Sequence, residues 1–123
     1  MNARRRRIQF VSDALVAQIA EGRKTASVVK LGEVDLSDGP YDDPLAVGEL
    51  YDVYDSHLIV RATIRIQAME LCRWDDIPER LWRGETNVSA DEFRADHLDY
   101  FADGEELPGS YEFVAYYFCL VRP

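Results

Sequence analysis

The stretch Phe113-Val114-Ala115-Tyr116-Tyr117-Phe118-Cys119-Leu120-Val121 is aliphatic, aromatic or sulfur-containing at every position, and it decides the fold. Side chains alternate between the two faces of a β-strand, so an unbroken run of this kind predicts a strand covered on both faces. The run is too short to cross a bilayer as a helix, which takes about 20 residues. We therefore expect it to form a strand in the middle of a closed or covered sheet.

Further strands are predicted on the N-terminal side of this run. Apolar and polar residues alternate over 58–69, and residues 25–29 and 50–54 are rich in strand-forming types. Residues 8–10 begin another apolar, strand-like stretch. Between these strands, residues 32–48 are rich in Asp, Gly and Pro and predict a long surface loop, which we expect to be mobile from Asp35 to Asp43.

About three short helices complete the expected fold. Ser12 can cap the first helix, and Gly22 supplies the left-handed residue that ends it. A second helix is expected to stop at Gly84, and Ser89 with Glu92 forms a capping box for a third. The pattern predicts a small α+β protein built on a β-barrel.

Length and charge limit the possible classes of protein. With 123 residues, 47% hydrophobic and 30% charged, the chain predicts one soluble domain, residues 8–123, after a flexible basic tail at residues 1–7. No signal peptide or membrane-spanning segment can be recognised, so we expect a cytoplasmic protein without a membrane partner. The net charge of −9 argues against a surface that coats duplex DNA.

The segment Gly22-Arg23-Lys24-Thr25-Ala26-Ser27 carries the clearest chemical signal. A helix is expected to end on its glycine, and a lysine follows at the turn into a strand on which Thr25 and Ser27 share a face. A lysine that is partly shielded from water there has a depressed pKa and can act as a base toward a serine hydroxyl. The plainer interpretation is a solvated turn lysine beside strand-forming residues.

Other candidate residues give weaker signals. Glu85 follows a helix-ending glycine, on an irregular connection where functional residues concentrate, and could act as a general acid or base beside Lys24. His57 is expected at a hairpin turn, and His97 is expected to pack on the face of its helix. No histidine or cysteine has a second ligand at metal spacing, so we expect no metal and no cofactor.

Taken together, these segments resemble the ASCH domain family, whose members have a PUA-like β-barrel. The resemblance spans nearly the whole chain. It ends with the aromatic-rich last strand, and its motifs are Gly22-Arg23-Lys24-Thr25, Ala26-Ser27, Val47-Gly48-Glu49, Gly84-Glu85, Ser89, Phe93-Arg94, His97 and Tyr100-Phe101.

The resemblance implies a protein that acts on RNA or nucleosides. Small ASCH proteins include amidohydrolases that deacetylate N4-acetylcytidine and ribonucleases that cleave single-stranded RNA. The resemblance to the amidohydrolases implies catalytic roles for Lys24, Ser27 and Glu85. Arg23 and Thr25, from the same motif, are expected to bind substrate. Two alternatives remain open: a non-catalytic RNA- or nucleotide-binding module, and a protein-binding domain without a small ligand.

Overall fold

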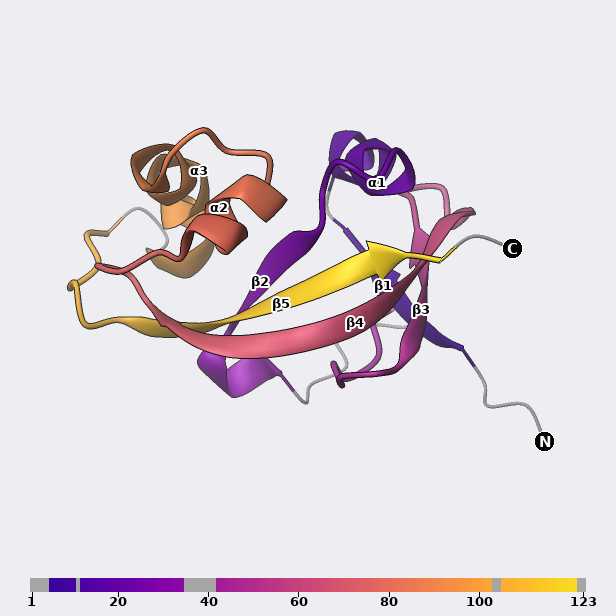
Figure 1. Ribbon diagram of the computed structural model, residues 1–123, viewed down its shortest axis with the longest axis horizontal. Coiled ribbons are helices and arrows are strands. Elements are labelled where there is room, and N and C mark those ends of the chain that lie inside the picture. Colours follow the sequence, from indigo (N-terminus) through magenta and orange to yellow (C-terminus); the bar gives the residue numbers. More distant parts are fainter. Residues whose placement is uncertain (1–4, 11, 35–41, 103–104, 122–123) are drawn as a thin grey trace.

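A five-stranded mixed sheet, curled into a half-barrel, forms the centre of the molecule (Figure 1). The structure is a computed structural model and describes residues 5–10, 12–34, 42–102 and 105–121. The strands lie in the order β1-β3-β4-β5-β2; β1 pairs with β3 in parallel, and the other pairs are antiparallel. Their bounds are β1 (Arg6–Gln9), β2 (Ala26–Lys30), β3 (Leu50–Tyr54), β4 (Val60–Arg73) and β5 (Glu112–Leu120). The expected α+β class is confirmed, although β1 and β2 remain as edges.

Strand β5 is covered on both faces, as its sequence predicts. Phe113 through Phe118 are all buried, while Cys119 and Leu120 are half-buried. The strand lies between β4 and β2, and its side chains enter two separate hydrophobic clusters. Tyr116 and Phe118 pack with helix α1 (Asp13–Ala20) on one face. The alternating residues pack on the other face with the two later helices.

Helix α1 follows the expected capping rules. The Ser12 side chain accepts a hydrogen bond from the backbone N–H of Ala14, and Gly22 has a φ of +80° just after the helix. Val16 and Ile19 are the buried residues of this helix, and they pack on the sheet. A short 3₁₀ helix, Leu31–Glu33, follows β2.

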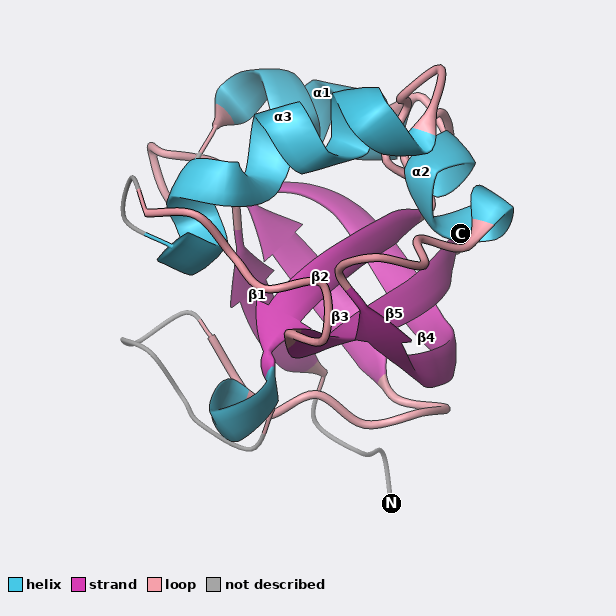
Figure 2. Ribbon diagram, turned by 90° about the vertical axis from the view of Figure 1, so that its left-hand side faces the viewer, coloured by secondary structure: helices cyan, strands magenta, loops and turns pink. Residues whose placement is uncertain are grey.

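Helices α2 (Glu79–Gly84) and α3 (Ala90–Ala102) cover the second face of the sheet. Figure 2 shows the three helices grouped at one end of the curled sheet. Ser89 caps α3 by accepting a hydrogen bond from the backbone N–H of Glu92, whose carboxylate accepts from Val88. The capping serine is therefore confirmed, and the glutamate bonds one residue further back than a capping box requires.

Several boundaries differ from the sequence prediction. Strand β1 begins at Arg6, so the last two residues of the expected tail pair with β3. Strand β4 is longer than expected and reaches Arg73. The predicted mobility over 35–43 falls mostly outside the described residues. Within the described part of the chain, no helix combines the length and the apolar character that a membrane crossing requires.

Candidate functional site

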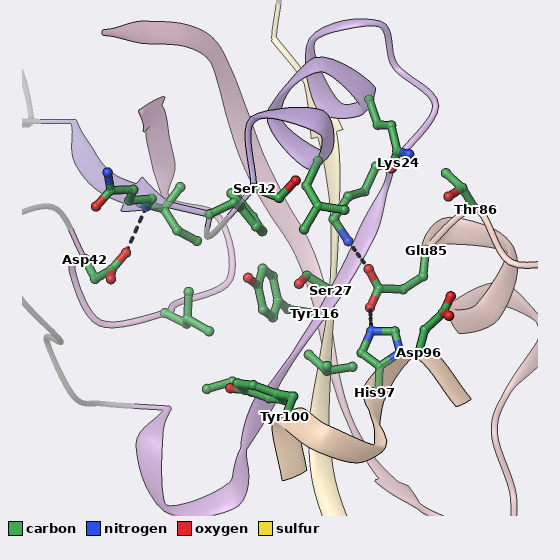
Figure 3. Close-up of a pocket in the computed structure, with 18 of the residues that line it drawn as sticks. Ser12, Lys24, Ser27, Asp42, Glu85, Thr86, Asp96, His97, Tyr100 and Tyr116 are labelled. Carbon is green, nitrogen blue, oxygen red and sulfur yellow. Dashed lines mark hydrogen bonds and ion pairs between the residues drawn. The ribbon is translucent and has the colours of Figure 1, made fainter. Parts of the chain in front are cut away.

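The gap between the two edge strands of the half-barrel holds a cavity of about 940 Å³. Residues from β1, α1, β2, α3 and β5 line it, together with the segment that follows α2. Figure 3 shows side chains from these elements around a common space. All three residues with an expected catalytic role, Lys24, Ser27 and Glu85, line this cavity. The structure thus brings them together, while their roles stay a prediction.

Lys24 is a buried lysine at the entry to β2. The turn after α1 places it, because its backbone N–H donates to the carbonyl of Gln18 at 3.1 Å. Its side chain is 1% exposed, and Nζ donates to the Ala26 carbonyl at 2.6 Å and pairs with Oε1 of Glu85. Burial lowers the pKa of Lys24 to about 7, and the adjacent carboxylate opposes this by favouring the ammonium form. Lys24 is therefore not the solvated turn lysine of the plainer interpretation.

Glu85 reaches Lys24 because α2 approaches β2 very closely at Gly84. The backbone N–H of Thr25 donates to the Gly84 carbonyl at 2.8 Å, and a Cβ on Gly84 would lie 2.6 Å from the Ala26 Cβ. Only glycine fits this contact without a shift of the backbone. The glycine near the end of the helix is therefore needed for close packing rather than for a left-handed conformation.

The left-handed position at the end of α2 is taken by Thr86, with a φ of +67°. Its N–H donates to Arg83 and the N–H of Asn87 donates to Trp82, the two hydrogen bonds of a Schellman motif. A β-branched residue rarely adopts this conformation, so the local backbone is strained. Glu85 is the C-cap residue just before this reversal of the chain, and its side chain lines the cavity, where it is 4% exposed.

His97 is the third member of the same network. Its Nε2 lies 2.6 Å from Oε2 of Glu85, and its Nδ1 lies 2.8 Å from the carbonyl oxygen of Phe93. The imidazole stacks on the Phe93 ring at a centroid distance of 4.0 Å. The pKa of His97 is lowered, chiefly by burial and also by the charge of Lys24. Packing on the helix face is thus only part of its role, because the same ring contacts the buried carboxylate.

Ser27 lies on the cavity side of β2, opposite Tyr116 of β5. The pairing of β2 with β5 places the serine hydroxyl near the phenol of Tyr116. Burial raises the pKa of Tyr116, so this phenol stays protonated and its proton remains available for hydrogen bonding. Figure 3 shows Ser27 and Tyr116 in the same cavity as Lys24 and Glu85.

The two residues expected to bind substrate lie apart from this group. Arg23 is exposed, and its Nε donates to Glu21 at 2.7 Å. Thr25 lines a second, smaller cavity of about 400 Å³ beside the end of β5, which Lys24 also borders. Their predicted role in binding stays untested.

Sequence reasoning gave His97 little weight and did not select Tyr116 at all. The available signal for His97 was its place in the motif that resembles ASCH proteins, four residues after Phe93 on one helix face. Tyr116 lies inside an apolar run that predicts only burial. Its contact with Ser27 depends on the register of β2 against β5, which local sequence does not reveal.

Cys72 and His57 do not line this cavity. Burial raises the pKa of the Cys72 thiol to about 12, which keeps it protonated and unreactive. His57 lies in the exposed turn between β3 and β4. Among the described residues, no group of three histidine, cysteine, aspartate or glutamate side chains is arranged to hold a metal ion.

The cavity has a strongly acidic lining. Lys24 is the one lysine or arginine among the described residues that line it. Besides Glu85, five carboxylates contribute to the wall: Glu33, Asp42, Asp43, Glu92 and Asp96. The aromatic rings of Phe10, Tyr100 and Tyr116 supply flat apolar surface between them. Such a lining favours an uncharged planar ligand over a polyanion.

Comparison with solved structures identifies the fold. An ASCH domain from Lactobacillus crispatus matches 88% of this chain and 70% of its own, with a TM-score of 0.70 and 17% identity. The chain has the fold of an ASCH domain. A DUF984 protein from Enterococcus faecalis matches 98% of this chain and 83% of its own, with a TM-score of 0.72 and 16% identity.

A third ASCH structure, from Zymomonas mobilis, matches 94% of this chain and 65% of its own, with a TM-score of 0.55 and 18% identity. These likenesses confirm the PUA-like fold that the motifs imply, and the structure shows its sheet as a curled half-barrel. No family model and no curated protein matches the sequence.

Proposed function

We propose that this ASCH-fold protein is an amidohydrolase that removes an acyl group from the exocyclic nitrogen of a nucleoside such as N4-acetylcytidine. The observation that carries the proposal is a buried lysine and glutamate beside a serine hydroxyl in a cavity of about 940 Å³. That volume falls within the range of ordinary small-molecule sites. Buried titratable groups at the wall of a cavity are typical of active sites.

The roles follow from the donors and acceptors of each group. Nζ of Lys24 already has two acceptors, the Ala26 carbonyl and Glu85. The third position on Nζ is an N–H in the ammonium form and a lone pair in the amine form. With a pKa of about 7, a large fraction of Lys24 is amine at neutral pH, so this lone pair can take a proton from Ser27.

The proposed reaction proceeds through an acyl ester on Ser27. The serine oxygen attacks the acyl carbon and its proton passes to Lys24. The carbon–nitrogen bond then breaks, and the leaving nitrogen of the nucleoside takes the proton back from Lys24. Water hydrolyses the ester, which releases the carboxylic acid and restores the serine. The balance is one amide and one water converted to one amine and one acid.

The acidic lining favours a nucleoside over RNA as the substrate. Each phosphate of an RNA strand would approach a wall with several carboxylates and one lysine. A neutral nucleoside avoids this repulsion, and the carboxylate product would be repelled from the site after hydrolysis. We therefore expect N4-acetylcytidine to be a better substrate than its 5′-phosphate, and an oligoribonucleotide to be the poorest.

The test is turnover of N4-acetylcytidine, its 5′-phosphate and an oligoribonucleotide that contains N4-acetylcytidine, each followed by chromatography of the deacetylated product. We expect Lys24→Met to abolish turnover and Ser27→Ala to lower kcat by at least about 100-fold. Arg23→Gln is the matched control for loss of a nearby cation: unchanged turnover would leave Arg23 outside the site, and a raised KM would support its predicted binding role. Turnover that persists at a normal rate in Lys24→Met would contradict the proposal.

A non-catalytic nucleoside-binding module is the second candidate. The ion pair between Lys24 and Glu85 favours it, because the carboxylate holds a proton on the amine that a base must release. Calorimetric binding of cytidine and N4-acetylcytidine without any product after prolonged incubation would support this candidate over the hydrolase.

A further inference from the structure

The solvent exposure of the side chains increases along the series of contacts from Lys24 through Glu85 to His97. The lysine and glutamate side chains are 1% and 4% exposed, whereas the histidine side chain is 18% exposed. Glu85 uses one oxygen for each neighbour: Oε1 contacts Lys24 and Oε2 contacts His97. A change of charge at His97 therefore affects Lys24 through the Glu85 carboxylate that both side chains contact.

The hydrogen bonds of His97 require a proton between it and Glu85. The carbonyl oxygen of Phe93 can only accept, so the contact of 2.8 Å to Nδ1 requires a hydrogen on Nδ1. A neutral imidazole with that hydrogen presents a lone pair at Nε2. A lone pair and a carboxylate oxygen do not approach to 2.6 Å unless a proton lies between them. That proton belongs either to an imidazolium or to a protonated Glu85.

We propose that His97 is a positioning residue for the Lys24 base: by holding a proton against Oε2 of Glu85, it weakens the attraction of that carboxylate for the lysine ammonium. The effect on catalysis rests on the proposed function; the effect on the protonation of Lys24 does not. Without the shared proton, Glu85 would present its full negative charge to Lys24 and hold it as ammonium. With the proton in place, the amine is released for Ser27.

The surroundings of His97 are consistent with this role. Within the part of the chain that the structure describes, the charged groups that face it come from three places: Lys24 before β2, Glu85 after α2 and Asp96 on its own helix. Asp96 favours the protonated imidazole, while burial and Lys24 disfavour it. When Lys24 loses its proton, its positive charge disappears, so His97 and Glu85 bind their shared proton more tightly. The two protonation equilibria are therefore coupled. The stack on Phe93 fixes the ring in the plane that this contact needs.

The chain allows a direct test, because Lys24 and Lys30 are its only lysines and His57 and His97 its only histidines. In protein labelled with ¹³C at the lysine Cε, the two resonances can be titrated separately, and Lys30→Arg assigns them. His97→Phe keeps a ring for stacking on Phe93 and removes both nitrogens. We expect the titration midpoint of Lys24 to rise by about one pH unit, a tenfold change in proton affinity, while that of Lys30 stays unchanged.

His57→Phe is the matched control and is expected to leave Lys24 unaffected. If His97→Phe does not fold, His97→Gln serves instead: it can donate to Glu85 but carries no charge, so the midpoint should move in the same direction. An unchanged Lys24 midpoint in a folded His97 variant would overturn the proposal.

The titration needs no substrate, so its failure is separate from failure of the proposed hydrolase. If acyl-nucleoside turnover is present, the acidic limb of kcat/KM against pH should move upward together with the Lys24 midpoint. If His97 has only a structural role, its substitution should lower the rate and leave the acidic limb of kcat/KM at the same pH.

Discussion

Two glutamates of this molecule each contact a cationic side chain and a second side chain, one glutamate in a buried environment and the other at the surface. Glu85 contacts Lys24 with one oxygen and His97 with the other, and Glu70 contacts Arg80 at 3.3 Å and the Tyr117 hydroxyl at 2.5 Å in the same way. The side chains of Lys24 and Glu85 are 1% and 4% exposed, against 56% and 32% for Arg80 and Glu70.

The difference shows what makes such a network chemically useful. Arginine keeps its charge at any pH at which proteins fold, and exposed pairs exchange freely with water. The Glu70 network can therefore hold α2 against the sheet, but its arginine has no proton to exchange. Lysine loses its proton when burial is strong enough, so the proposed base belongs to the Glu85 network. The Glu85 and Glu70 networks therefore differ in their burial and in the type of cation that they contain.

The largest expected effect comes from removing each carboxylate. Glu85→Leu leaves Lys24 buried and charged without a partner, so we expect a loss of about 3–5 kcal/mol in the free energy of unfolding at pH 6. Glu70→Leu leaves an exposed arginine and should cost about 1 kcal/mol. Urea denaturation at pH 6 measures both, and at pH 9 the cost of Glu85→Leu should shrink because Lys24 is then neutral. Equal costs at pH 6 would mean that burial does not distinguish the two networks.

The second prediction concerns the contact that brings α2 against β2. A Cβ at position 84 would lie 2.6 Å from the Ala26 Cβ, so we expect Gly84→Ala to cost about 1–3 kcal/mol. Helix propensity alone would favour alanine by about 1 kcal/mol, so a net loss isolates the clash.

Gly32→Ala is the control for this change, because no heavy atom lies within 4 Å of its added Cβ. Its unfolding free energy should stay within about 0.5 kcal/mol of that of the unmodified protein. A Gly84→Ala variant as stable as this control would show that the close approach is not tightly constrained.

The third prediction uses the pKa of Lys24, which is about 7 in the folded protein against an ordinary value of 10.5. Between these two values the unfolded chain binds the proton that the folded protein has lost, so stability rises with pH. The slope has an upper limit of about 1.4 kcal/mol per pH unit, and it vanishes below pH 7, where both states are protonated.

Urea unfolding at several pH values between 6 and 10 tests this, with Lys24→Met as the reference that removes the contribution of Lys24 to the slope. Arg80→Met should keep the slope of the unmodified protein, because an arginine does not titrate in this range. Parallel curves for the unmodified protein and Lys24→Met would contradict a lowered lysine pKa.

How much of this could be predicted from the sequence depends on the range of each interaction. The strand at Phe113, the helix caps at Ser12 and Ser89 and the left-handed Gly22 are local, and all four were predictable. The open edge between β1 and β2 was not, because it depends on how far the sheet curls.

The candidate site is the long-range part of the prediction. Lys24 and Glu85 lie 61 positions apart, so nothing in local sequence forces them together, and only the resemblance to ASCH proteins gave the pair a catalytic role with Ser27. The second proton partner of Glu85 was not predicted, because a histidine on an apolar helix face has the same local pattern whether it packs or binds. Thr86 was missed for a similar reason: a β-branched residue is a poor candidate for a left-handed cap.

The smallest expected effect is the coupling between Arg80 and Glu70. The guanidinium lies 3.9 Å from the centroid of the Tyr117 ring and 3.3 Å from Glu70, so Arg80→Gln should cost about 0.5–1 kcal/mol through both contacts. A double-mutant cycle with Glu70→Gln isolates the ion pair, for which we expect about 0.2–1 kcal/mol. In 1 M salt the screening length falls to about 3 Å, so this coupling should nearly disappear. The cost of Glu85→Leu should persist under the same conditions, because salt does not reach a buried pair. Should the coupling of Arg80 to Glu70 exceed about 2 kcal/mol and resist salt, the two networks would be energetically alike, and exposure could no longer be the reason for proposing proton transfer in only one of them.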